Sequence, residues 1–166
     1  MRAVLVLSLL LGALGCDGPG GVDAGRDAAG AMPTVELGTG TSAFEPIPET
    51  GAELELVMGP QGGFHVFVTA RIEDLDVEDM LIRYAAHDAA TGELVGHEAT
   101  YVTDSTRLAR DGTGWVRAGD FVILHDSSPD TVRGRVLEIS VHVEEASGAL
   151  SADDSRVVTI VDNVGG

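Results

Sequence analysis

The stretch "RGRVLEISVHVEE" at residues 133–145 shows the most regular alternation of apolar and polar side chains in the chain. Apolar residues recur at every second position from Leu137 to Val143, and polar residues stand between them. Because successive side chains of a β-strand point to opposite faces, this period predicts a strand with one buried face. We therefore expect a fold that is built on β-strands.

Further short apolar runs lie on both sides of this stretch, and Gly, Pro, Asp and Ser separate them. Strands are expected at residues 53–58, 64–73, 92–103, 114–126 and 156–162. Short strands with frequent turns are typical of β-sandwiches. The sequence predicts an all-β fold, namely a single immunoglobulin-like antiparallel β-sandwich of about seven to eight strands at residues 51–166.

Residues 73–94 fit two secondary structures. Val77, Met80, Leu81 and Tyr84 recur at helical spacing, with an aspartate in front of them that could cap a helix. The same stretch also alternates in the manner of a strand. We favour the strand because short runs with regular turns continue on both sides.

The N-terminus has the pattern of an export signal. Arg2 precedes an apolar run at residues 3–14 that is too short to cross a bilayer, and small residues then lead to Cys16. The pattern resembles the bacterial lipoprotein signal, although Ala13 stands where that signal usually has leucine. The resemblance implies a signal peptide at residues 1–15, acylation of Cys16 and anchoring to the membrane, inner or outer. An ordinary cleaved signal is the alternative.

Residues 16–50 combine the lipidated cysteine with a segment dominated by Gly, Ala, Pro, Thr and Asp. Such a segment buries too little apolar area to offset the entropy of ordering it, so we expect a flexible stalk. As an alternative for its later part, "VELGTGTSAFEPIPE" at residues 35–49 could add a short strand, with Phe44 and Ile47 docked onto the edge of the domain. The chain has a net charge of −17, and all ten of its basic residues are arginine. This charge excludes nucleic acid as a partner, and the lack of lysine excludes Schiff-base and P-loop chemistry.

The sequence "EDLDVED" gathers five carboxylates within seven residues. They are Glu73, Asp74, Asp76, Glu78 and Asp79. Calcium prefers several carboxylate and carbonyl oxygens around one point, so this turn is a candidate calcium site. It lacks the glycine of an EF-hand loop. A solvated, charged turn between strands is the alternative interpretation.

Histidines offer a second candidate metal site. His65, with His97 or His125, is the most plausible pair for copper or zinc, which favour imidazole ligands. None of these residues has a tight ligand spacing, so ordinary surface histidines are the alternative. The chain has no G-x-S-x-G or H-E-x-x-H motif, and its one cysteine belongs to the signal pattern.

The residues together predict a non-enzymatic lipoprotein of the cell envelope, whose acidic sandwich serves as a binding or structural module. Another envelope protein is the expected partner, at an exposed sheet edge. No cofactor is expected apart from the calcium alternative. The turn "GPQGG" at residues 59–63 is expected to join two antiparallel strands. The stretch that it begins also resembles segments of secreted bacterial lipoproteins.

Overall fold

The computed structural model describes residues 31–60, 62–126 and 128–162, which belong to one compact unit that begins at Ala31. The expected signal peptide and Cys16 lie outside the described residues. The strands of this unit are β1 (Thr34–Thr39), β2 (Glu45–Pro46), β3 (Ala52–Glu55), β4 (Val57–Met58), β5 (Phe64–Glu73), β6 (Met80–Asp88), β7 (Ala99–Thr103), β8 (Ala109–Asp111), β9 (Gly114–Ile123), β10 (Val136–Glu144) and β11 (Ser151–Val161). Two short helices, η1 (Ser105–Arg107) and α1 (Pro129–Val132), complete it.

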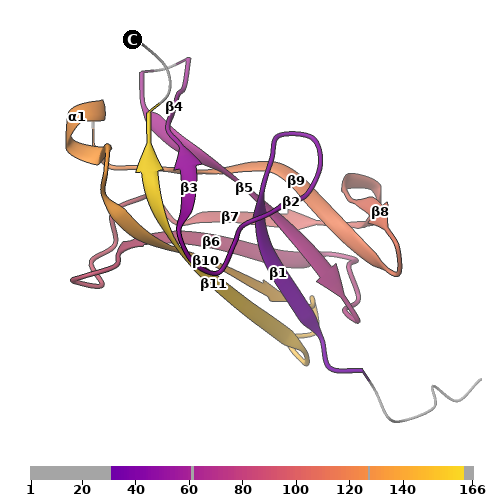
Figure 1. Cartoon of the computed structure of the whole chain (residues 1–166). Helices are drawn as coiled ribbons and strands as arrows, with labels where there is room; N and C mark the ends of the chain where they lie inside the picture. The colour runs from indigo at the N-terminus through magenta and orange to yellow at the C-terminus, as the bar shows by residue number, and fades with distance from the viewer. Residues whose placement is uncertain (1–30, 61, 127, 163–166) are drawn as a thin grey trace, which may run out of the picture. The chain divides into compact units, whose positions relative to one another are not determined.

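The strands form two sheets that pack face to face (Figure 1). One sheet has the order β2-β1-β5-β9-β8, with β4 paired to β5, and the other has the order β3-β11-β10-β6-β7. The strands β1-β5-β9-β8 and β11-β10-β6-β7 correspond to A-B-E-D and G-F-C-C′ of immunoglobulin domains, in the same chain order. The all-β sandwich is thus confirmed.

One edge pair departs from the antiparallel pairing of the other strands. Strand β3 pairs with β11 in parallel, and Figure 1 shows both arrowheads pointing the same way. Leu54 lies opposite Ile160 in this pair, and both side chains are buried. The parallel pair places alternate residues of β3 in the core while its glutamates face solvent.

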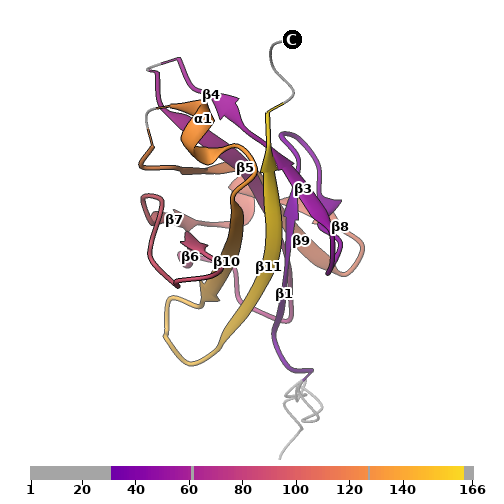
Figure 2. The ribbon, with the colours of Figure 1, turned by 60° about the vertical axis from the view of Figure 1, so that its left-hand side comes forward.

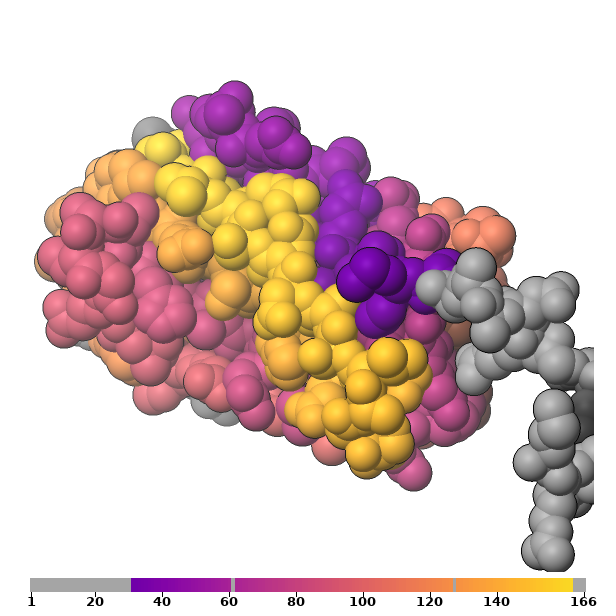
Figure 3. Space-filling view, turned by 90° about the horizontal axis from the view of Figure 1, so that it is seen from below, coloured from indigo at the N-terminus to yellow at the C-terminus, as the bar shows by residue number. Residues whose placement is uncertain are grey.

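The expected stalk at residues 16–50 needs a correction, because the sandwich begins before residue 51. Strand β1 pairs with β5 over five residues, and Leu37 in its middle is fully buried. On the other side β1 lies beside β11 (Figures 2 and 3), where the Leu37 amide donates to Asp154 Oδ2 at 2.7 Å. Two apolar residues at alternate positions, Val35 and Leu37, are enough to add this glycine-containing strand to the core.

Residues 80–88 form strand β6, so the preference for a strand over a helix is confirmed. Strand β6 lies between β10 and β7, where its pairing with β10 covers eight residue pairs. The long alternating stretch found in the sequence is β10, and Leu137, Ile139 and Val143 are fully buried there. Within the described residues, no helix has the length and apolar character needed to span a membrane.

Candidate binding groove

Two neighbouring strands place large apolar side chains on the solvent-facing side of the first sheet. In β5, Val66 and Val68 face the core, so His65 and Phe67 face outward. In β9, Phe121 and Ile123 face outward by the same alternation, and they are 38% and 39% exposed. The register of the two strands sets His65 opposite Ile123 and Phe67 opposite Phe121. Four side chains therefore gather at one place on this face.

His65 is the polar centre of this group. Its ring centroid lies 5.1 Å from that of Phe67 in an edge-to-face contact, and 5.1 Å from that of Phe121 in a tilted one. Aromatic pairs at this separation are attractive beyond the area that they bury. Burial lowers the pKa of His65 below its usual value of 6.5, because the charged imidazolium loses hydration among apolar neighbours. The ring is therefore neutral at pH 7 and able to donate or accept a hydrogen bond.

The glycine-rich turn between β4 and β5 forms one wall. The Gly59 amide donates to the Gly63 carbonyl at 2.7 Å, and the Gly62 amide donates to the Gly59 carbonyl at 3.0 Å. Gly62 has a φ of +85°, which favours glycine. The expected hairpin role of residues 59–63 is confirmed, because β4 and β5 pair antiparallel.

These walls enclose a hollow of about 590 Å³, which we call the apolar groove. It is lined chiefly by Gly59, Pro60, His65, Phe67, Phe121 and Ile123. Gly119 lines its far end, where a side chain would come within 2.7 Å of the Thr41 carbonyl. The volume is in the range of small-molecule and side-chain pockets.

A second hollow of about 370 Å³ lies on the other side of Phe67, and we call it the acidic hollow. It is lined chiefly by Thr41, Glu45, Glu53, Glu55, Val57 and Phe67. The three glutamates are exposed, and in the described part of the chain none of them makes a hydrogen bond or an ion pair through its carboxylate. The apolar groove and the acidic hollow thus share Phe67 as a wall.

The acidic turn that we considered as a calcium site is held by hydrogen bonds and connects β5 to β6. Asp76 Oδ1 accepts from the Glu78 amide at 3.1 Å, and the Asp76 amide donates to Glu145 at 2.9 Å. Asp74 and Asp79 have φ values of 58° and 54°, which turn the chain from β5 into β6. Among the described residues, no three acidic, histidine or cysteine side chains are arranged to hold a metal ion. The carboxylates, Glu73 included, do not converge.

The structure pairs the histidines differently from our expectation. The rings of His97 and His125 lie 4.7 Å apart at 85°, whereas His65 contacts Phe67 and Phe121 in the apolar groove. The His97 amide donates to the Ile123 carbonyl at 2.7 Å, and the His125 amide donates to the Val95 carbonyl at 2.9 Å. Two segments distant in sequence therefore present their imidazoles on the same side.

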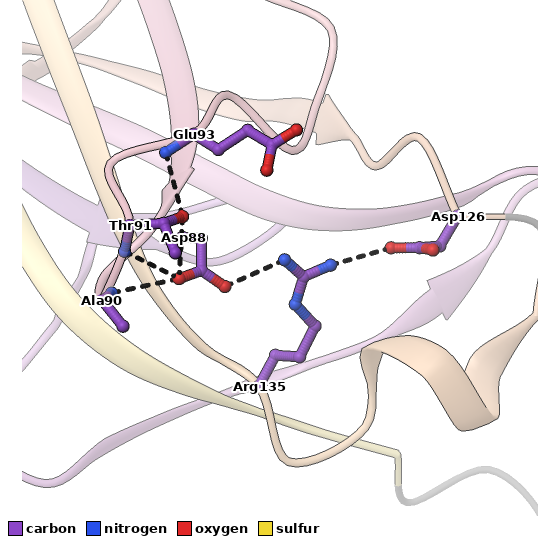
Figure 4. Close-up of polar contacts among 6 residues, drawn as sticks. All are labelled: Asp88, Ala90, Thr91, Glu93, Asp126 and Arg135. Atoms are coloured by element: carbon purple, nitrogen blue, oxygen red, sulfur yellow. Dashed lines mark hydrogen bonds and ion pairs between the residues drawn. The ribbon is translucent and has the colours of Figure 1, made fainter.

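An ion-pair network fixes the segment next to His125 (Figure 4). Arg135 donates to Asp126 at 3.0 Å through Nη1 and to Asp88 at 2.9 Å through Nη2. The other Asp88 oxygen accepts from the amides of Ala90 and Thr91, both at 3.1 Å. Arg135 and these amides lower the pKa of Asp88. The network therefore joins the turn after β6 to the loop that follows β9.

A buried polar cluster lies between the two sheets. Asp120 is 3% exposed, and Arg117 Nε donates to its two carboxylate oxygens at 3.1 and 3.0 Å. The fully buried Tyr84 lies near this carboxylate, yet its hydroxyl completes no hydrogen bond within the described residues. Burial first, and then the Asp120 charge, raises the pKa of Tyr84 well above its usual value of 10.0. Arg117 and Asp120 satisfy each other's charge within the cluster, so we assign it a structural role at the contact between β6 and β9.

The sequence analysis did not single out Phe121, Ile123 or the three hollow-lining glutamates. The signal for the first two was present, because both occupy the outward phase of an alternating run whose inward phase is Val122 and Leu124. Glu45 lay in the range assigned to the stalk. No protein-family model matches the chain, and no curated protein matches its sequence.

Proposed function

We propose that this chain is an exported lipoprotein, held in the cell envelope by acyl chains on Cys16, whose sandwich is a non-enzymatic binding module. The observation that supports this proposal most directly is the apolar groove. Soluble proteins tend to bury large apolar side chains or to cover them with a partner, so a concave group of exposed ones marks an interaction site. The groove replaces the sheet edge that we first favoured as the contact surface, and an envelope protein remains the proposed partner.

The chemistry of the groove supports binding over catalysis. Among the described residues that line it, His65 is the one titratable side chain, and its ring neighbours are Phe67 and Phe121. General-base catalysis requires a nucleophile or a second oriented group within hydrogen-bonding distance. Aromatic side chains around a single polar ring instead provide apolar contact area with one orienting hydrogen bond.

Lipid attachment is tested by metabolic labelling of the full chain with radioactive palmitate. The wild-type chain should be labelled and recovered with membranes, while a Cys16→Ala variant should lose the label. Labelling of the Cys16→Ala variant, or a wild-type chain without label, would contradict the anchor.

The groove is tested by site-specific photo-cross-linking in cells. A photoreactive phenylalanine analogue is placed at Phe121 and, as a matched control, at Val157, which is 49% exposed on the outer side of β11. Adducts of one defined mass are expected from position 121 and not from position 157. Equal patterns at both positions, or no adduct at 121, would overturn the proposed binding surface.

A second candidate function rests on the adjacent rings of His97 and His125. Two imidazoles on one side can chelate copper or zinc, with water completing the coordination, and the site would be open and exchangeable. Calorimetric titration with zinc and with copper should give one site in the wild type and none in His97→Asn. His142→Asn is the control, because His142 is held by Asp153 at 2.7 Å. Unchanged binding in His97→Asn would exclude this site.

A further inference from the structure

The apolar groove and the acidic hollow form one composite surface around Phe67. The groove offers Phe121 and Ile123 to an apolar side chain, and the hollow offers carboxylates within reach of the other side of the same ring. A ligand that filled both would need an apolar group and a cationic group close together. This inference rests on the proposed function, since it names what the binding surface holds.

The free carboxylates select the charge of the ligand. Glu45, Glu53 and Glu55 have no cationic partner in the described part of the chain. Six arginines pair with carboxylates elsewhere in the described residues: Arg71, Arg83, Arg117, Arg133, Arg135 and Arg156. The three glutamates therefore give the acidic hollow an uncompensated negative charge that attracts an external cation. An anionic ligand, such as an acidic lipid headgroup, is disfavoured at this place.

The shape of the surface favours a peptide over a sugar or an isolated amine. A sugar needs several hydrogen-bonding groups, whereas His65 is the one polar side chain among the described residues that line the apolar groove. In an extended peptide, the side chains of residues i and i+2 share a face, so this pair can occupy two adjacent hollows. Phe67, between the hollows, can also contact a lysine or arginine through its ring face.

We propose that the composite surface binds an extended basic peptide segment of a partner protein, in which an apolar residue and a lysine or arginine stand at alternate positions and so share one face. The apolar side chain packs against Phe121 and Ile123 in the apolar groove. The cationic side chain crosses Phe67 and pairs with Glu53 and Glu55 in the acidic hollow. Recognition joins apolar burial with charge complementarity, and the latter mainly sets specificity and the rate of encounter.

The test uses residues 31–166, which include both sheets and the whole described core. Binding of three dye-labelled hexapeptides is followed by fluorescence anisotropy at low salt. The probes place the two groups at alternate positions: Gly-Phe-Ser-Lys-Ser-Gly, its glutamate counterpart Gly-Phe-Ser-Glu-Ser-Gly and the polar counterpart Gly-Ser-Ser-Lys-Ser-Gly. The first should bind at least about tenfold more tightly than either of the others, because it alone can fill both hollows.

Two variants of equal net charge separate a local effect from a general one. Glu53→Gln/Glu55→Gln should weaken binding of the lysine probe by at least about threefold, while Glu78→Gln/Glu93→Gln, at exposed positions elsewhere, should leave it unchanged. Phe121→Ala should weaken it as well. Circular dichroism checks that each variant is folded.

The outcomes distinguish this inference from the proposed function. Equal binding of the lysine and glutamate probes, equal effects of the two double variants, or no binding at millimolar peptide would each overturn the basic-peptide inference. Adducts at position 121 in cells would then still support the groove as a binding surface. Loss of both the adducts and the peptide selectivity would overturn the two proposals together.

Discussion

Replacing Leu37 tests whether the segment before residue 51 is part of the cooperative fold. Leu37 is fully buried in the middle of β1, with its amide bound to Asp154 across the gap between the sheets. Truncation of a fully buried leucine to alanine costs about 2–5 kcal/mol, through lost apolar transfer and the cavity that remains. The backbone hydrogen bond is retained, so about 3 kcal/mol is expected for Leu37→Ala. A flexible stalk residue would cost nothing measurable.

The assay is equilibrium unfolding in urea, followed by circular dichroism, of residues 31–166. A loss of about 3 kcal/mol, with a slope of about 2 kcal/mol/M, lowers the unfolding midpoint by roughly 1.5 M. The control is Met32→Ala, because Met32 is 82% exposed and its loss should change the free energy of unfolding by less than about 0.5 kcal/mol. A Leu37→Ala variant as stable as the control would refute the inclusion of β1 in the core.

Three further perturbations test buried groups through the free energy of unfolding. Arg117→Met should cost about 3 kcal/mol because it leaves the Asp120 charge buried and unpaired, while adding Asp120→Leu should restore most of the loss. Because the pKa of His65 is lowered in the folded state, the unfolded chain binds the proton more readily. The contribution of His65 to the free energy of unfolding is therefore complete above pH 6.5 and falls as the pH is lowered below that value. His65→Phe should remove this acid dependence. The raised pKa of Tyr84 has the opposite sign, so stability is complete below pH 10.0 and is lost as the pH rises above it. Tyr84→Phe should remove that alkaline loss.

The long alternating strands could be predicted because one pattern decides each of them. Strand β10 carries four buried aliphatic residues at alternate positions, which is enough to assign both the strand and its inward face. The periodicity of residues 80–88 fits both a helix and a strand, and the regular turns on either side correctly favoured strand β6. Local pattern was sufficient wherever a strand has its own apolar face.

Local pattern indicates strand β1 only weakly, as an alternative within the expected stalk, because its stability comes from distant residues. It has two buried aliphatic side chains, Val35 and Leu37, and a glycine at position 38 that local propensity penalises. Phe44 folds back over Gly38, where a Cβ atom would lie only 2.5 Å from its ring. Such close approach to another segment makes the glycine necessary, and sequence neighbours alone do not reveal it.

Only part of the candidate site could be predicted from the sequence, for a similar reason. Alternation assigns His65, Phe67, Phe121 and Ile123 to outward faces, but pairing between β5 and β9 depends on register across more than fifty residues of chain. The contact between the His97 and His125 rings was not predicted, on the same ground. The bridge between Gly96 and Leu124 brings His97 to His125, and no local spacing encodes it.

The two outer faces of the sandwich differ in a way that favours the first sheet as the binding side. On the second sheet, His142 pairs with Asp153 and the Ser155 hydroxyl donates to Glu138. On the first sheet, Arg71 holds Glu36 and Asp111, and β5 and β9 carry the apolar groove. The uncompensated glutamates flank this groove from two strands, Glu45 from β2 of the first sheet and Glu53 and Glu55 from β3 at the edge of the second sheet. Exposed apolar area and unpaired like charges both oppose stability in the free protein. A basic, partly apolar peptide would relieve both at the same place.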